Sequence, residues 1–158
     1  MNVEILQQKG HNFLWIDDHL WMYDIPAERK AQKDISNKAF GDVLVAGYGL
    51  GILQRFLSEN KKVKSITTIE ISEEVVNKVK DIYGKIHGEI IIENFYDFHT
   101  NNKFNCVIGD IWEEITPGAL EDYKKFKNKA KRLLKKNGKI LGWGKEFFEY
   151  LINKEKIK

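Results

Sequence analysis

From residue 42 onward, the sequence alternates between short β-branched runs and segments whose apolar residues recur at helical spacing. Because helices separate the apolar runs, right-handed crossovers should pair the strands in parallel and place helices on both faces of the sheet. We therefore predict an α/β fold, a doubly wound and mainly parallel sheet whose ligands bind at the carboxyl ends of its strands. The predicted strands span residues 42–46, 64–71, 89–93, 104–109 and 139–143.

Residues 1–24 follow a different pattern, with short alternating segments separated by polar turns. This pattern is typical of an N-terminal β-hairpin or meander. A length of 158 residues indicates a single domain, which we divide into the hairpin (1–24), a core (40–144) and a C-terminal helix (145–158). The longest predicted helix begins at Thr116-Pro117 and is closed by Asn137-Gly138.

Composition excludes several classes of protein. The single cysteine, Cys106, excludes an internal disulfide and a multi-cysteine zinc site, and it is typical of the reducing cytoplasm. The sequence has no apolar run of about 18 residues, and its first residues lack the pattern of a signal peptide. His11, His87 and His99 show no metal-binding spacing, and Asp17-Asp18-His19 forms either a cation site or, as we expect, a turn. We therefore expect a cytoplasmic protein with no membrane span and no metal.

Charge is unevenly distributed along the chain. The net charge of +3 is mild, but residues 124–139 contain nine Lys or Arg residues and no acid. Such a run is either a solvated helix face or a binding surface for an anionic partner such as RNA.

A glycine loop follows the first core strand and carries the strongest functional signal. Gly47, Gly49 and Gly51 allow a sharp turn and a close approach of a ligand to the backbone, or they simply permit the turn. Glu70 ends the second core strand 19 residues after Gly51, where a carboxylate accepts hydrogen bonds from ribose hydroxyls. Ile52 replaces the third glycine of the dinucleotide fingerprint, so a pyrophosphate site is disfavoured.

Over about residues 12–144 the chain resembles the Rossmann-like class I S-adenosylmethionine (SAM)-dependent methyltransferases. It is most similar to the branch that includes spermidine synthases and guanidinoacetate methyltransferase. The similarity rests on Val43 to Gly51, on Thr68-Ile69-Glu70-Ile71 and on Phe104 to Asp110. The cofactor-binding residues that this resemblance implies are Gly47, Tyr48, Gly49, Gly51, Glu70, Ile71, Asn94, Phe95 and Asp110.

Each part of SAM has an implied location. The glycine loop would line the methionine moiety, and Glu70 would hold the ribose. Asn94 stands where the branch often has an aspartate facing the adenine amino group, and Phe95 would stack on the ring. Asp97 is a second candidate for this position.

Asp110 and Glu113 are the predicted catalytic residues. Spermidine synthases begin a D-x-x-D pattern at the end of the fourth strand, and this chain has Glu113 in the second position. A carboxylate there can orient an amine and accept its proton, although a strand-end aspartate can also be structural. Leu50 stands where those synthases usually have an aspartate, which argues against aminopropyl transfer, whereas Tyr48 is similar to an aromatic residue of the guanidinoacetate enzyme.

The two ends of the chain raise further expectations. The N-terminal aromatic cluster comprises Trp15, His19, Trp21 and Tyr23. These residues either pack the hairpin against the sheet or form a lid over the SAM pocket.

Family members usually add strands six and seven as an antiparallel hairpin, but only 15 residues follow Trp143 here. The sheet would therefore have an uncovered edge, and we predict a homodimer that covers it.

Three functions remain open at this level. The first is a methyltransferase acting on an unidentified acceptor. The second is a SAM-using transferase similar to spermidine synthase, or a SAM-cleaving enzyme. The third is a non-catalytic SAM-binding interaction module.

Overall fold

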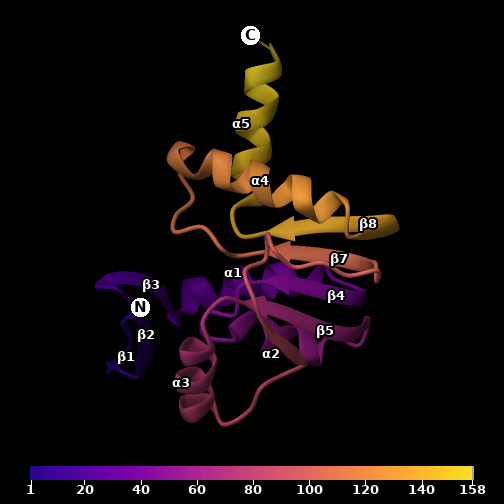
Figure 1. Cartoon of the computed structure of the whole chain (residues 1–158). Helices are drawn as coiled ribbons and strands as arrows, with labels where there is room; N and C mark the ends of the chain where they lie inside the picture. Colours follow the sequence, from indigo (N-terminus) through magenta and orange to yellow (C-terminus); the bar gives the residue numbers. More distant parts are fainter. Residues whose placement is uncertain (158) are drawn as a thin grey trace.

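The computed structural model describes residues 1–157 and confirms the predicted α/β architecture (Figure 1). The elements in chain order are β1 (Val3–Gln8), β2 (His11–Ile16), β3 (His19–Tyr23), α1 (Pro26–Asn37), β4 (Gly41–Ala46), α2 (Ile52–Glu59), β5 (Val63–Glu70), α3 (Glu73–Tyr83), β6 (Glu89–Ile92), β7 (Phe104–Gly109), a 3-10 turn (Pro117–Ala119), α4 (Leu120–Lys131), β8 (Leu134–Gly142) and α5 (Lys145–Ile157).

Five strands form the central sheet in the order β6-β5-β4-β7-β8, and all four pairings are parallel. The chain order therefore reverses between β4 and β7, which is the topological switch point where open α/β sheets bind ligands. Within residues 1–157 the sheet has no strand beyond β8. None of the helices in that range is long and apolar enough to cross a membrane.

Alternate residues of the strands face two different apolar layers, as the two-residue period of a strand requires. Leu44 and Val107 face a core that contains Phe126 of α4 and Phe148 of α5. Val43, Val45, Cys106 and Ile108 face the opposite layer, which contains residues of α2 such as Leu53 and Leu57. Helices thus cover both faces of the sheet, as the alternation of strands and helices predicts.

The N-terminal strands β1, β2 and β3 form a separate antiparallel meander. Figure 1 shows this meander beside the arrowheads of the central strands, at the carboxyl edge of the sheet. Val3, Leu14 and Met22 are buried there against Val75, Val76 and Val79 of α3. The meander therefore lies next to the predicted ligand-binding edge.

The prediction that Asn137-Gly138 closes the long helix is wrong, because α4 ends at Lys131. Phe104 donates its backbone N–H to the carbonyl of Leu133 at 2.8 Å, and Leu134 pairs with Phe104. Pairing with β7 thus overrides the helical tendency of this segment. Asn137 has a left-handed φ of 65°, and the register shifts between Phe104 and Cys106, so residues 137–138 form an irregularity within β8.

The C-terminal helix α5 packs on α4 of the same chain. The ring of Phe148 is fully buried and stacks on Tyr123 with centroids 4.9 Å apart. Glu149 accepts hydrogen bonds from the Tyr123 hydroxyl at 2.9 Å and from Lys127 at 2.7 Å. Much of the apolar face of α5 is therefore covered without a second chain.

Candidate functional site

The glycine loop after β4 adopts left-handed backbone angles at Gly47, Gly49 and Gly51, with φ of 97°, 54° and 70°. Two of these glycines are required by packing within the core. A Cβ on Gly47 would lie 2.6 Å from the carbonyl oxygen of Asp110, and one on Gly51 would lie 2.8 Å from the Tyr48 hydroxyl. A Cβ on Gly49 would instead meet Met22 of the meander, with the sulfur at 2.5 Å.

Glu70 fixes the glycine loop from the tip of the neighbouring strand. Its carboxylate accepts the backbone N–H of Tyr48 at 3.0 Å through Oε1 and the backbone N–H of Ser72 at 2.8 Å through Oε2. Gln54 of α2 is buried behind the loop and donates to the carbonyl of Gly47 at 3.2 Å. The loop and the acidic strand tip thus form one hydrogen-bonded unit.

A cavity of about 230 Å³ opens beside this unit, at the carboxyl ends of β4 and β7. The two predicted catalytic residues, Asp110 and Glu113, both line it together with Gly49. The structure therefore brings the D-x-x-E pair and the glycine loop to one cavity. Its other walls are the meander, α1, the segment after β7 and the residue that follows β8; they include Trp21, Tyr23, Glu28, Trp112 and Trp143.

Two of the four residues of the N-terminal aromatic cluster lie at this cavity. Trp21 and Tyr23 line the cavity, whereas Trp15 and His19 are not among the residues around it. Met22 lies between these two residues, lines the cavity as well and is buried over the glycine loop. The third strand of the meander thus forms one wall of the cavity.

Asp110 shares a buried amide with a second carboxylate. Gln32 of α1 is fully buried, and its Nε2 donates to Oδ2 of Asp110 at 3.2 Å and to Oε1 of Glu28 at 3.0 Å. Burial, the nearby charge of Glu28 and the opposing hydrogen bond from Gln32 together raise the pKa of Asp110 to about 7. Burial also raises the pKa of Glu28, against the effect of its hydrogen bond from Gln32. A carboxyl with this pKa can exchange a proton near neutral pH.

In the segment after β6, the structure differs from the prediction that Phe95 stacks on the adenine ring. The side chain of Phe95 is buried in the core and lies 5.6 Å from the ring of Phe126, so the structure does not offer it for stacking on a ligand. Asn94 is exposed, and its side-chain oxygen accepts the backbone N–H of Tyr96 at 2.9 Å. Asp97 is exposed in the turn that follows.

Ile71 and Ile92 are exposed apolar residues at the same edge, with 59% and 44% of their surfaces accessible. Ile71 directly follows Glu70, and Ile92 pairs with Glu70 across the β5–β6 ladder. Two exposed isoleucines therefore flank the acidic strand tip. Ile71 belongs to the set of cofactor-binding residues predicted from the sequence, whereas Ile92 does not.

Four residues near the site had no functional signal in the sequence: Met22, Glu28, Gln32 and Gln54. Glu28 and Gln32 are one helical turn apart, but only the packing of α1 against the end of β7 brings them to Asp110. The fully buried amide of Gln32 is the feature that distinguishes this pair from an ordinary surface pair. A single sequence does not reveal such burial.

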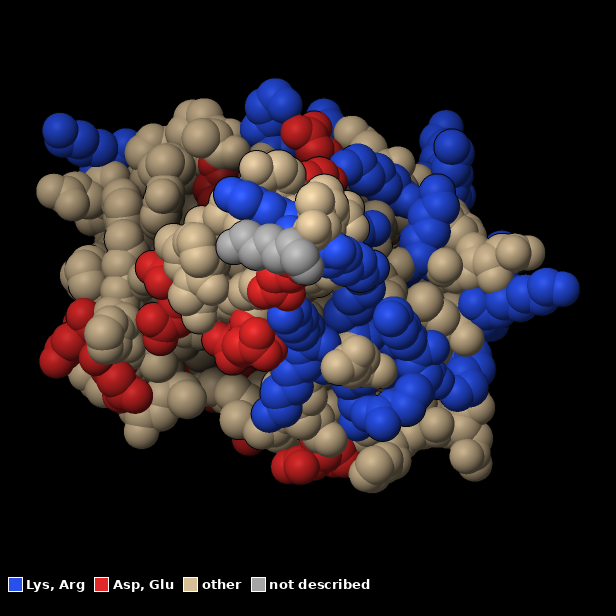
Figure 2. Space-filling model, turned by 90° about the horizontal axis from the view of Figure 1, so that it is seen from above, with Lys and Arg blue, Asp and Glu red and all other residues tan. Residues whose placement is uncertain are grey.

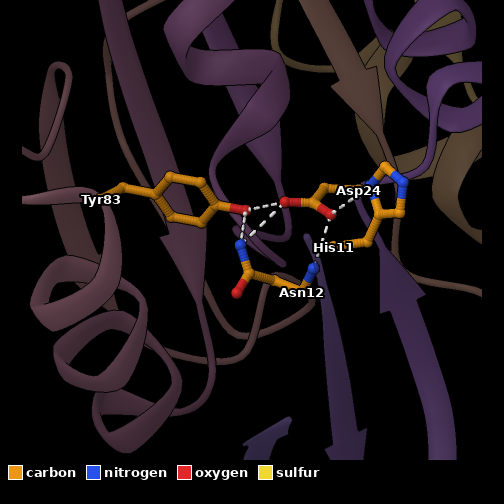
Figure 3. Close-up of polar contacts among 4 residues, drawn as sticks. All are labelled: His11, Asn12, Asp24 and Tyr83. Atoms are coloured by element: carbon orange, nitrogen blue, oxygen red, sulfur yellow. Dashed lines mark hydrogen bonds and ion pairs between the residues drawn. The ribbon is translucent and has the colours of Figure 1, made fainter. Parts of the chain in front are cut away.

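A second polar cluster joins the meander to α3 (Figure 3). Asp24 accepts the backbone N–H of Asn12 at 2.6 Å, the amide of Asn12 at 2.9 Å and the hydroxyl of Tyr83. His11 lies 3.7 Å from the same carboxylate. Burial acts to raise the pKa of Asp24, but these hydrogen bonds and His11 lower it overall. The cluster thus anchors the base of the meander.

No group of three or more His, Cys, Asp or Glu residues within the described range 1–157 is arranged to hold a metal ion.

Comparison with solved structures shows that the chain has the fold of the class I SAM-dependent methyltransferases. An S-adenosylmethionine-dependent methyltransferase from Clostridium acetobutylicum aligns with a TM-score of 0.55 at 19% identity, over 75% of this chain and 50% of that one. A structure described as the DhpI-SAM-HEP complex aligns with a TM-score of 0.56 at 18% identity, over 74% of this chain and 55% of that one.

Curated relatives point to the same branch as the sequence resemblance. The polyamine aminopropyltransferase of Buchnera aphidicola is 28% identical over 117 residues, which are 68% of this chain and 41% of that enzyme. The enzyme of the same name from Shigella boydii is 30% identical over 106 residues, or 61% of this chain and 37% of that enzyme. The chain thus spans about two fifths of the length of these relatives. No family model matches the chain.

Proposed function

We propose that this protein binds SAM at the glycine loop and transfers its methyl group to an acceptor held in the cavity beside Asp110. The observation that carries the proposal is the shared location of three features. The glycine loop, its Glu70 anchor and the carboxyl pair of the D-x-x-E pattern converge on one edge of a sheet with the methyltransferase fold. The solved neighbours include proteins crystallised with SAM or its demethylated product.

The residues present are suited to a nucleoside. Each Glu70 oxygen accepts one backbone N–H and retains a lone pair for a ribose hydroxyl. Ile71 and Ile92 supply exposed apolar surface beside it for a base. SAM contributes a sulfonium-activated methyl group, and the protein contributes orientation and exclusion of water.

The chemistry of the cavity supports an amine or another cationic acceptor. Glu28, Asp110 and Glu113 provide carboxyl groups, and Trp21, Trp112 and Trp143 provide aromatic rings. Carboxylates pair with ammonium groups, and indole faces attract cations. With its raised pKa, Asp110 is suited to accept the proton that a protonated amine must lose before it attacks.

Aminopropyl transfer is the second candidate, and the names of the curated relatives favour it. Against it, Leu50 is buried in the glycine loop at the place where spermidine synthases usually have an aspartate. A SAM-cleaving enzyme and a non-catalytic SAM-binding module complete the alternatives.

Isothermal titration with SAM and with decarboxylated SAM, followed by product analysis with a panel of amines, separates these functions. A methylated amine supports the proposal, and methylthioadenosine with an aminopropylated amine supports the second candidate. Methylthioadenosine formed without an acceptor indicates cleavage. Binding without turnover indicates a non-catalytic module, and failure to bind either nucleoside contradicts all of these functions. Glu70→Gln serves as the binding-deficient control.

A further inference from the structure

The basic run at residues 124–139 is divided between two environments by the packing of α4. Lys124 and Lys127 face α5, where Lys124 lies 3.0 Å from Glu155 and Lys127 lies 2.7 Å from Glu149. Lys135 similarly lies 3.0 Å from Asp42. These three lysines serve to hold elements of the fold together.

The opposite side of α4 borders an open groove of about 660 Å³, formed with the loop that precedes β7. Lys103, Lys129, Arg132, His99, Asn101 and Tyr96 are among its lining residues. No acidic residue in the described part of the chain lines this groove. Asp97 and Glu93 act electrostatically on Lys129, and Asp122 acts on Tyr96, but none of these three acids belongs to the lining.

Lys129 builds the wall of the groove rather than offering its charge to a ligand. Its ammonium group donates to the carbonyl oxygens of Tyr96 at 3.1 Å and Phe98 at 2.6 Å, and the side chain is buried. Lys125 lies over the ring of Tyr96, with Nζ 4.1 Å from the ring centroid. An aromatic side chain thus lies among cations at the groove, in a loop that the buried lysine holds in place.

Cations continue from the groove onto the neighbouring surface. Viewed from above, Lys and Arg side chains form one broad field on one side of this face, while many acidic side chains gather on the other side (Figure 2). Lys125, Lys131, Arg132 and Lys136 are exposed. Among residues 1–157 none of these four has an acidic partner within 4.0 Å. These four cations therefore have no direct ion-pair partner in the described part of the chain.

We propose that this groove and the adjoining basic field bind single-stranded nucleic acid. Unpaired cations neutralise phosphates. The ring of Tyr96 and the exposed amide of Asn101, which both line the groove, are suited to unstacked bases. A membrane is disfavoured because an interfacial surface needs apolar side chains that enter the lipid. None of the exposed large apolar residues lines the groove or lies between 120 and 139.

The groove is separate from the proposed methyl-transfer site. Residues 96–103 lead into the amino end of β7, whereas Asp110 follows its carboxyl end. Binding of nucleic acid is therefore measured without SAM, and its outcome is independent of the proposed enzymatic function.

Fluorescence anisotropy with a labelled 12-nucleotide single-stranded RNA, the same sequence as single-stranded DNA, and the RNA duplex tests the proposal. The single strands should bind more tightly than the duplex, and affinity should fall steeply between 50 and 200 mM salt, as expected when phosphates are neutralised (roughly −0.7 in log–log slope per phosphate contact). Equal binding of RNA and DNA indicates recognition of the phosphate backbone, and tighter binding of RNA indicates contacts to the 2′-hydroxyl. Both outcomes support the proposal.

A pair of charge-matched variants locates the surface. Lys125→Gln with Arg132→Gln should weaken binding roughly tenfold and reduce the salt slope by about 1.4, the value for two phosphate contacts. Lys61→Gln with Lys62→Gln removes the same charge from exposed residues on another surface and should leave affinity within about twofold. If the first variant is unfolded by circular dichroism, Lys131→Gln with Lys136→Gln replaces it.

Three results would overturn the proposal: no binding of either single strand at 50 mM salt, equal losses in the two charge-matched variants, or tighter binding of the duplex. Vesicles containing phosphatidylserine provide the membrane comparison. Sedimentation of the protein with these vesicles without binding of RNA or DNA would show that the basic field serves a lipid surface instead.

Discussion

The sulfur of Met22 accepts a hydrogen bond from the backbone N–H of Leu50 at 3.3 Å, so a thioether of the chain itself covers the glycine loop. The same side chain lies where a ligand must approach Gly49. In the proposed complex, the methionine moiety of SAM competes for this space. The Met22 side chain must therefore leave this position when SAM binds.

Met22→Ala should raise the affinity for SAM, because no side chain then has to leave the loop. It should also lower the free energy of unfolding by about 2 kcal/mol through loss of buried apolar contacts. Calorimetry and urea denaturation measure the two effects. Val3→Ala, which truncates a buried residue of β1, a strand that does not pair with β3, should lose stability without a gain in affinity. An equal change of affinity in both variants would contradict a specific role for Met22.

Glu70→Gln should weaken SAM binding by roughly 1.5–3 kcal/mol, since charge-assisted hydrogen bonds to the ribose are lost. The amide also accepts through only one atom, so the bonds from Tyr48 and Ser72 are not both retained. Glu89→Gln neutralises an exposed acid on the neighbouring strand and should leave the dissociation constant unchanged. An unchanged constant in folded Glu70→Gln would remove this residue from the site.

Asp110 should make the protein less stable as the pH rises from about 4 to about 7. Its pKa is raised in the folded state to about 7, so over this range the folded protein binds more protons than the unfolded chain. The contribution of Asp110 to the free energy of unfolding is therefore fully present below the pKa that this residue has in the unfolded chain. It is lost as the pH rises through the pKa of Asp110 in the folded protein. Asp110→Asn should reduce the difference between thermal midpoints at pH 5 and pH 8, and an undiminished difference would exclude Asp110 as its source.

Tyr83→Phe should destabilise the protein by about 1–3 kcal/mol, because the buried carboxylate of Asp24 loses the hydroxyl that donates to it. The pKa of Asp24 is lowered in the folded protein, so its ionised form contributes to stability at pH values above the usual aspartate pKa. This contribution is lost as the pH falls through the pKa of Asp24 in the folded protein. Urea denaturation at neutral and acidic pH measures the change. Tyr150→Phe removes an exposed hydroxyl and should have no measurable effect.

Self-association is expected at micromolar concentration, because β6 and β8 are the edges of the central sheet within residues 1–157 and edges favour pairing. Light scattering should report about twice the chain mass of 18.5 kDa. The burial of Phe148 against Tyr123 removes part of the apolar surface that motivated this expectation. A mass of one chain at all concentrations would refute the dimer.

The sequence by itself determined the elements that depend on local patterns. Val43-Leu44-Val45 defines a buried strand, and the hydroxyl of Ser72 caps α3 by accepting the backbone N–H of Val75. Gly84 ends that helix in the left-handed conformation. The glycine loop and Glu70 were also recognisable, because their spacing follows from one strand–helix–strand unit. Such features depend on residues that are near one another in the chain.

Only the tertiary structure decided which distant side chains meet. It placed Met22 over Gly49 and Gln32 between Glu28 and Asp110, and it buried Phe95 in the core. It also ended α4 at Lys131, six residues before Asn137, because strand pairing stabilises the following segment more than helical hydrogen bonds do. These outcomes depend on how faces of separate elements pack, and local propensities and spacing contain no information about that packing.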